Sequence, residues 1–242
     1  MTSPVIFLHG IGAGADGYQW LQPLVPDSEA LDMPGFGEEP WRRPATWETL
    51  ADWLHGKLAG KPPAILFGHS FGGMLALEMA IRHPDDVAGI VNCASTPAFG
   101  GRDDSFKQQF LKARLDPLDK GKTMLDVGRG SAAMAAPGTD PDRLEAFAQS
   151  MGRVPQAVFR DILECLTTFN RRDDLGRVTV PVACISGAAD QAAPAKTVKR
   201  MHEALPDSEL TELPCGHLIP LEDPEACAAV IARLRQRLES AP

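Results

Sequence analysis

The stretch that most constrains this chain is an apolar run at residues 65–67 that stops at Gly68-His69-Ser70-Phe71-Gly72 and continues into the helix-forming residues 74–80. This order predicts a strand, a sharp elbow and a helix. The backbone at such an elbow is too tight for side chains at Gly68 and Gly72, so glycine relieves the crowding. Ser70 then lies at the tip of the turn with its hydroxyl exposed, as a nucleophile requires. The alternative interpretation is a Gly-rich turn in which Ser70 is the N-cap of an ordinary helix.

Composition and charge limit the fold and the partners. The 242 residues are 44% hydrophobic and 23% charged, which suits one well-buried core, so we expect a single domain with an insertion. The formal net charge of −8 gives an acidic surface that repels a nucleic-acid backbone and an anionic membrane. We therefore expect a small-molecule substrate, and neither nucleic acid nor membrane as a partner. A monomer and a homodimer fit the sequence equally well.

The sequence also predicts a compartment. No apolar stretch has the length needed to cross a bilayer, and the first residues lead into a strand without a signal-type apolar segment. The five cysteines are scattered and never form a Cys-x-x-Cys pair: Cys93, Cys165, Cys184, Cys215 and Cys227. Such cysteines are typical of small buried hydrophobes or free thiols in a reducing compartment. We expect a cytoplasmic protein.

The motifs that would indicate a cofactor or a metal are incomplete. Residues 10–14 begin like a dinucleotide-binding loop, but Ala15 stands where the last glycine of Gly-x-Gly-x-x-Gly belongs, and no basic residue nearby could bind a phosphate. The sequence holds no His-x-x-x-His pair and no cluster of carboxylates and histidines at ligand spacing. We expect neither a cofactor nor a metal.

The order of apolar segments predicts an α/β fold with a mostly parallel sheet of about six strands flanked by helices. The six expected strands cover residues 5–8, 29–31, 65–67, 87–93, 180–186 and 209–213. Thr46 is expected to cap a helix that runs to about Leu58, and a last helix spans about 224–238. Residues 97–172 lack strand-like runs and show helical spacing, so we expect a helical cap inserted between core segments 1–96 and 173–242.

Three polar residues each follow a predicted strand directly: Ser70, Asp190 and His217. The carboxyl ends of parallel strands meet at one edge of a sheet, so these side chains can converge there. A serine hydroxyl needs a base to take its proton, which His217 can do, and Asp190 can orient the imidazole and support its charge. The backbone N–H groups of Ile11 and Phe71 are candidate oxyanion donors.

Other residues compete for these roles. His9 and His69 are rival bases, although His9 suits a role in orienting the loop that carries Ile11, and His69 points elsewhere along the strained turn. Asp32 and Asp103 are rival acids. The carboxylate of Asp32 is better placed to accept hydrogen bonds from the backbone of adjoining loops.

Taken together, these residues resemble the α/β-hydrolase superfamily. The resemblance is carried by His9-Gly10, Asp32-Met33-Pro34-Gly35-Phe36-Gly37, Gly68-His69-Ser70-Phe71-Gly72-Gly73, Gly187-Ala188-Ala189-Asp190 and Gly216-His217. It spans nearly the whole chain and keeps the order Ser, Asp, His. It implies Ser70 as nucleophile, Asp190 as acid, His217 as base, and oxyanion donors at Ile11 and Phe71. Because His9-Gly10 comes so early, the opening hairpin of larger relatives has no room, and the first strand is expected near the edge of the sheet.

We expect a serine hydrolase that cleaves a carboxylic ester of a small or medium, largely apolar substrate through an acyl-enzyme on Ser70, because the expected cap supplies Phe, Met, Leu and Ala rather than charge clusters. Relatives that act as haloalkane dehalogenases or epoxide hydrolases have an aspartate nucleophile, so Ser70 disfavours both activities. A cofactor-free perhydrolase or haloperoxidase-like activity uses the same triad. A ligand receptor that reuses the fold would have no need of all three residues.

The nearest rival is hydrolysis of an enol-lactone or a carbon–carbon bond in a substrate that bears a carboxylate. That reaction requires a cation that faces the pocket. The candidates in the expected cap are Arg102, Arg129, Arg153 and Arg160. Arginines in such a position are more often solvated.

Overall fold

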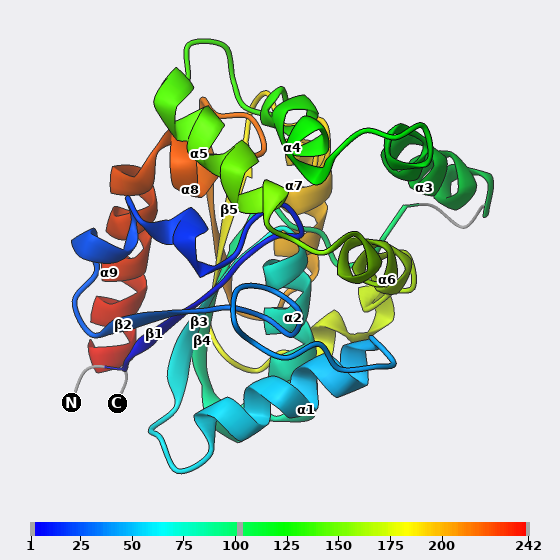
Figure 1. Cartoon of the computed structure of the whole chain (residues 1–242). Coiled ribbons are helices and arrows are strands. Elements are labelled where there is room, and N and C mark those ends of the chain that lie inside the picture. The colour runs from blue at the N-terminus through cyan, green and yellow to red at the C-terminus, as the bar shows by residue number, and fades with distance from the viewer. Residues whose placement is uncertain (1–2, 101–103, 241–242) are drawn as a thin grey trace.

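The computed structural model describes residues 3–100 and 104–240. Its six strands form one sheet in the order β2-β1-β3-β4-β5-β6, and every neighbouring pair is parallel (Figure 1). The strands are β1 (Val5–Leu8), β2 (Ser28–Leu31), β3 (Ala64–His69), β4 (Val87–Cys93), β5 (Val182–Gly187) and β6 (Ser208–Leu213). The predicted α/β class and the predicted sheet are confirmed, with β1 one place from the edge.

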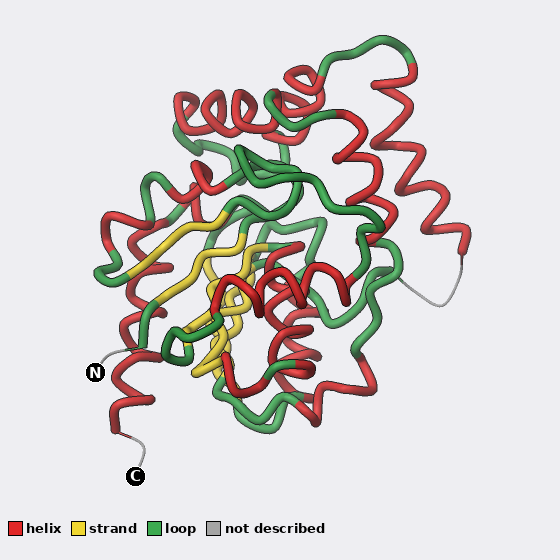
Figure 2. Tube along the Cα trace, turned by 60° about the horizontal axis from the view of Figure 1, so that its bottom comes forward, coloured by secondary structure: helices red, strands yellow, loops and turns green. Residues whose placement is uncertain are grey.

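Helices cover both faces of this sheet (Figure 2). Alternate residues of β1 enter different cores: Ile6 and Leu8 pack with α1 (Trp47–Leu58), α2 (Phe71–Arg82) and α7 (Ala195–Ala204), whereas Val5 and Phe7 pack with α9 (Pro224–Ser240). The four inner strands β1, β3, β4 and β5 are mostly apolar and buried, because a parallel sheet covered by helices buries both of its faces, whereas the edge strands β2 and β6 carry polar residues. The short helix α8 (Ile219–Glu222) precedes α9.

Four helices separate β4 from β5 in the chain. They are α3 (Asp104–Asp119), α4 (Met124–Ala132), α5 (Pro141–Gly152) and α6 (Gln156–Leu166). They lie beyond the carboxyl ends of the strands, with α3 and α6 on one side and α4 and α5 above the sheet in Figure 1. A single bridge between Ala98 and Asn170 closes the segment at its base. Short 3-10 turns complete the fold: η1 (Ala15–Tyr18), η2 (Gln22–Leu24), η3 (Pro84–Asp86) and η4 (Arg172–Arg177).

The ends of α1 follow its sequence. Thr46 is the N-cap and accepts a hydrogen bond from the backbone N–H of Thr49, while the side chain of Thr49 accepts one from the N–H of Thr46. This reciprocal cap satisfies two N–H groups that an open helix end leaves unpaired. The helix ends at Leu58, so the predicted cap and length are both confirmed.

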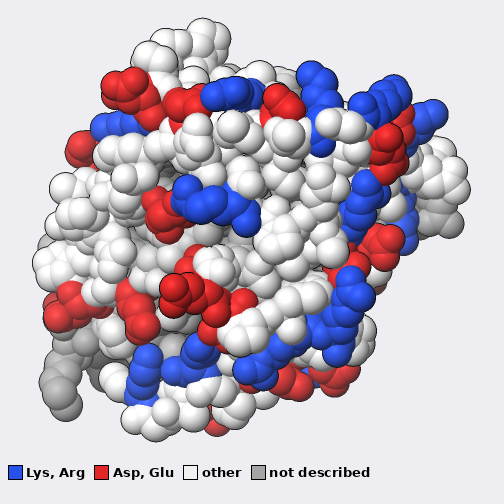
Figure 3. Space-filling view, in the orientation of Figure 1, with Lys and Arg blue, Asp and Glu red and all other residues white. Residues whose placement is uncertain are grey.

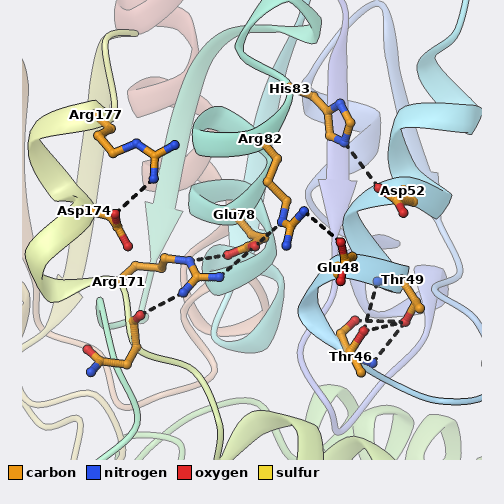
Figure 4. Close-up of polar contacts among 11 residues, drawn as sticks. Thr46, Glu48, Thr49, Asp52, Glu78, Arg82, His83, Arg171, Asp174 and Arg177 are labelled. Atoms are coloured by element: carbon orange, nitrogen blue, oxygen red, sulfur yellow. Dashed lines mark hydrogen bonds and ion pairs between the residues drawn. The ribbon is translucent and has the colours of Figure 1, made fainter.

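A buried carboxylate joins the helix that follows Ser70 to the segment after α6. The side chain of Glu78 is fully buried in α2 and accepts hydrogen bonds from Arg82 at 2.6 Å and from Arg171 at 2.6 and 2.9 Å (Figure 4). Arg171 follows α6, so two distant parts of the chain share one ion-pair network. Buried charges are tolerated when they are paired in this way.

All five cysteines are buried free thiols, as their scatter in the sequence predicted. In the described part of the chain, no helix combines the length and the apolar character needed to cross a membrane.

Candidate active site

The elbow after β3 holds Ser70 in a backbone conformation that few residues adopt. Its φ is 52°, in the left-handed region, and the flanking glycines leave no space for side chains. A Cβ at Gly68 would lie 2.3 Å from the carbonyl oxygen of Gly72, and a Cβ at Gly72 would lie 2.0 Å from that of Leu8. Ser70 does occupy the N-cap position of α2, but its side chain makes no capping hydrogen bond, so its hydroxyl is not used to cap the helix.

The structure brings Ser70, His217 and Asp190 into one chain of hydrogen bonds. His217 Nε2 lies 3.1 Å from Ser70 Oγ, and His217 Nδ1 lies 2.8 Å from Asp190 Oδ2. The carboxylate can accept only from a protonated Nδ1, which leaves Nε2 free to accept the proton of the serine hydroxyl. The imidazole and the carboxylate are both buried, whereas Ser70 is partly exposed.

Asp190 is held as a carboxylate by its surroundings. Its Oδ1 accepts hydrogen bonds from the backbone N–H groups of Ala192 at 2.7 Å and Ala193 at 2.9 Å. Burial raises the pKa of Asp190, but the hydrogen bond and charge of His217, together with these N–H groups, lower it further, so that the pKa lies below its usual value. The negative charge therefore persists beside His217 wherever an imidazole gains or loses its proton.

The rival bases have other partners. His9 Nδ1 donates to the carbonyl of Gly10 at 2.7 Å, and His9 Nε2 accepts from the N–H of Met33 at 3.0 Å. His69 Nε2 donates to the backbone carbonyl of His217 at 2.7 Å. Burial lowers the pKa of His9 to about 4 and that of His69 to about 3, so both rings remain neutral at ordinary pH.

Of the two rival acids, Asp32 is described by the structure, and its carboxylate binds the backbone of a neighbouring loop. Asp32 Oδ1 accepts a hydrogen bond from the N–H of Ala15 at 2.7 Å, which matches the backbone-binding role expected for it. Asp103 lies outside the described residues. Asp190 is thus the carboxylate that contacts the imidazole.

The two expected oxyanion donors flank Ser70. Phe71 is the first residue of α2, and its backbone N–H follows directly after the serine. The loop of Gly10 and Ile11 passes over the elbow, where a Cβ at Gly10 would lie 3.5 Å from Ser70 Cβ. Among the residues that the structure describes, neither the N–H of Ile11 nor that of Phe71 has a hydrogen-bond acceptor. Both can therefore donate to a bound oxygen.

A cavity of about 720 Å³ opens at Ser70 and His217, and Ile11 lies on its wall. The helices between β4 and β5 contribute apolar side chains to this wall, among them Phe110, Val127, Phe147, Met151 and Phe159. A cavity of this size can bury most of a small organic molecule, and apolar walls with a few polar groups are typical of ligand sites. The arrangement can exclude water from an apolar substrate while leaving its reacting group beside Ser70.

Glu222 is a site residue that the sequence analysis did not identify. Glu222 stands just before the last helix, where a carboxylate commonly complements the helix dipole. Instead, its Oε2 accepts from the N–H groups of Gly216 at 2.8 Å and Ala136 at 2.9 Å, and its Oε1 accepts from that of Leu218 at 2.8 Å. The carboxylate therefore holds both sides of the His217 loop, and ties that loop to the segment after α4. The N–H of His217 itself donates to the carbonyl of Met134 at 2.8 Å.

Three of the four candidate cations of the expected cap, Arg129, Arg153 and Arg160, lie away from the cavity wall. Arg129 donates to Glu145 at 2.8 Å, Arg160 donates to Asp119 at 2.5 Å, and Arg153 pairs with Asp16. These three arginines point to carboxylates elsewhere and do not line the cavity. Arg102 lies outside the described residues.

Two other arginines do line the cavity: Arg114 of α3 and Arg172 at the start of η4. Neither arginine could be identified from the sequence, because the sequence does not tell which side of a helix packs toward the cavity. Helical spacing offers a signal for Arg114, since it follows Phe106 and Phe110 at intervals of four residues.

One group of metal-capable side chains occurs in the described residues, away from this cavity. The ligand atoms of His55, His83 and Asp86 lie within 4.8 Å of one another. His55 Nδ1 is 2.6 Å from Asp86 Oδ2, and the two imidazole rings stack at 4.3 Å. An ion pair with a stacked second ring accounts for these contacts.

Comparisons with known proteins agree with this geometry. The model of the "Alpha/beta hydrolase family" matches residues 5–230. A pimeloyl-[acyl-carrier protein] methyl ester esterase of Aromatoleum aromaticum is 30% identical over 94% of this chain and 96% of that protein. Lipase LipV of Mycobacterium tuberculosis is 28% identical over 94% of this chain and 91% of that protein.

Solved structures share the fold. The enol-lactonase from Burkholderia xenovorans LB400 superposes with a TM-score of 0.84 at 18% identity, over 98% of this chain and 92% of that one. MenH from S. aureus superposes with a TM-score of 0.85 at 19% identity, over 98% of this chain and 95% of that one. At this level of identity the likeness concerns the fold.

Proposed function

This chain belongs to the alpha/beta hydrolase family, and we propose that it is a serine hydrolase that cleaves carboxylic esters through an acyl-enzyme on Ser70. The single observation that carries the proposal is the hydrogen-bond chain from Ser70 Oγ through His217 to Asp190, at 3.1 and 2.8 Å. The esterase and lipase names of the relatives support the same reaction class.

The first half of the reaction forms the acyl-enzyme. Ser70 Oγ attacks the ester carbonyl carbon while His217 Nε2 takes the hydroxyl proton, and Asp190 supports the imidazolium that results. The N–H groups of Ile11 and Phe71 donate to the oxyanion of the tetrahedral intermediate. When the intermediate collapses, the bond to the alkoxy oxygen breaks, and the alcohol leaves with the proton from Nε2.

The second half releases the acid. Water loses a proton to His217 Nε2 as its oxygen bonds to the acyl carbon, and a second tetrahedral intermediate forms. That intermediate breaks the bond to Ser70 Oγ, which regains the proton from His217. The products are one carboxylic acid and one alcohol, and the enzyme returns to its starting state.

The helices α3–α6 act as the cap that covers this site, so the chain divides into a core of residues 1–96 and 173–242 and a cap of residues 97–172. The apolar side chains that the cap presents to the cavity support a small or medium, largely apolar substrate. The five free thiols support a reducing, cytoplasmic compartment as the place of the reaction.

The test is turnover of a short-chain aryl ester by Ser70→Ala. We expect kcat to fall by about four orders of magnitude or more, because the covalent step is lost. Circular dichroism and the melting temperature should stay close to those of the unchanged protein. Ser28→Ala is the control, since Ser28 lies at the amino end of β2, whereas the elbow lies at the carboxyl end of β3. Turnover that persists in Ser70→Ala would overturn the proposal.

A further inference from the structure

One face of α3 points into the cavity. Phe106, Phe110 and Arg114 recur at intervals of four residues and all line the cavity wall. Phe99 packs against both aromatic rings, with centroid distances of 5.5 Å to Phe106 and 4.8 Å to Phe110. This face thus ends in an arginine after two aromatic rings. The position of α3 at the side of the molecule is seen in Figure 1.

The guanidinium of Arg114 has an aromatic support but no acceptor. Its centre lies 4.2 Å from the centroid of the Phe110 ring, which is a stacking distance for a cation. None of the residues that the structure describes accepts a hydrogen bond from it or pairs with its charge. Burial lowers the pKa of Arg114, because a desolvated guanidinium holds its charge less favourably. A guanidinium carries five N–H donors, and leaving them partly desolvated costs free energy until an acceptor arrives.

Among the residues that the structure describes, cations outnumber carboxylates on the cavity wall. Among the described residues that line the wall, Asp16 is the one carboxylate, and it already pairs with Arg153 and accepts from Ser150 at 2.5 Å. The cations on the wall are Arg114 and Arg172, and Arg172 donates to the carbonyl of Gly100. Within the part of the wall that the structure describes, the guanidinium of Arg114 is therefore left free for an anion.

This positive site is local. The chain as a whole carries a net charge of −8, and positive and negative side chains are interspersed on the face shown in Figure 3 rather than gathered into one basic surface. General attraction from the surface would not concentrate anions here. Any preference for an anionic substrate must come from the cavity itself.

We propose that Arg114, stacked on Phe110, binds a carboxylate at the end of the substrate remote from the ester that Ser70 cleaves. The substrate class is then a half-ester of a dicarboxylic acid, with an apolar chain between its two ends. A planar guanidinium matches a carboxylate through two parallel hydrogen bonds. One free guanidinium suits a monoanion better than a phosphate dianion. This proposal rests on the proposed ester hydrolysis at Ser70.

The test compares half-esters with neutral esters. Aryl half-esters of unbranched dicarboxylic acids, in a series of increasing chain length, are each paired with an aryl ester of equal length that ends in a methyl group. We expect kcat/KM to favour the half-ester by about tenfold or more, as for a charged hydrogen bond of about 1.5–3 kcal/mol, and mainly through KM. The preference should peak at one chain length, because the distance from Ser70 to Arg114 is fixed.

Variants of α3 and α4 locate the effect. Arg114→Met should reduce the ratio of the two kcat/KM values by about 10- to 100-fold. Arg114→Lys should keep part of the preference, because it retains a point charge without the planar fork. Arg129→Met is the matched control, since Arg129 is an exposed arginine paired with Glu145 outside the cavity, and it should leave the ratio unchanged.

The outcomes separate the two proposals. The carboxylate subsite would be overturned if the enzyme hydrolysed neutral esters and half-esters with equal kcat/KM. It would also be overturned if Arg114→Met left the ratio of the two kcat/KM values unchanged. Either result would leave the proposed ester hydrolysis intact. Failure to hydrolyse every ester in both series would count against the reaction at Ser70 itself.

Discussion

Glu222 connects the His217 loop to the helices that cover the sheet. Its two carboxylate oxygens accept from three backbone N–H groups, those of Gly216, Leu218 and Ala136. Two of these residues are the immediate neighbours of His217 in the chain. The carboxylate therefore acts as a positioning residue: it fixes the backbone from which the imidazole reaches Ser70, without itself touching the reacting atoms.

We expect Glu222→Gln to lower kcat by about 10- to 100-fold while KM changes by less than about threefold, because a displaced imidazole slows proton transfer but leaves the cavity wall intact. An amide offers one oxygen and turns an NH₂ group toward at least one of the N–H donors. Glu222→Asp, which keeps two oxygens, should recover part of kcat. Steady-state kinetics with an aryl ester supply the measurement.

Glu225→Gln is the control for this change. Glu225 is exposed in the first turn of α9, so its amide variant should retain both constants. A parallel rise of KM with the fall in kcat would instead indicate general loosening of the site and contradict a positioning role.

At the residue scale, the sequence predicted the parts of the site that depend on local backbone geometry. Ser70 was identified by its glycines, and Asp190 and His217 by the strands that precede them, because the ends of parallel strands must share one edge. The role of Glu222 could not be predicted, because its hydrogen-bond partners are backbone N–H groups, which leave no pattern in the sequence. The role of Arg114 could not be predicted either, because tertiary packing decides which side of α3 lines the cavity.

Among the elements, α2 holds a fully buried carboxylate that pairs with two arginines. It begins at the elbow, and its buried Glu78 joins Arg82 of the same helix to Arg171 after α6. The hydrogen bonds to Glu78 raise the pKa values of both arginines. Loss of the carboxylate would leave two cations facing each other at the base of α2.

We expect Glu78→Gln to reduce the free energy of unfolding by about 3 kcal/mol, because removing one partner of a buried ion pair leaves an uncompensated charge. Urea denaturation followed by circular dichroism measures this change. Glu48→Gln is the matched control: Glu48 also pairs with Arg82, at 3.3 Å, but its side chain is 64% exposed. An exposed pair contributes less than about 1 kcal/mol. Equal losses in the two variants would contradict the structural role of Glu78.

The predicted bounds of helices and strands agree with the structure where the sequence contains a residue that starts or ends such an element. The strand expected at 87–93 and the helix capped by Thr46 have the bounds that were predicted. The strand expected at 180–186 begins at Val182, after Pro181, which cannot donate to a neighbouring strand. The four-residue helix α8 was not predicted, since a single turn gives no hydrophobic period.

For the whole molecule, the parallel sheet accounts for the site. It places the ends of β3, β5 and β6 at one edge, and α3–α6 enclose the space beyond that edge in a cavity of about 720 Å³. The sheet could be predicted because continuous apolar runs are the mark of strands buried on both faces. The shape and charge of the cavity could not, because they depend on how four amphipathic helices pack against that edge.

The central claim is that Ser70, His217 and Asp190 work as one unit at this edge. The most direct test is covalent labelling with a fluorophosphonate, followed by mass spectrometry of the peptides. We predict one adduct per chain, located on Ser70, with a labelling rate that falls by about three orders of magnitude in His217→Ala, because the serine loses its base. An adduct on another serine, or labelling of Ser70 at an unchanged rate without His217, would contradict the account.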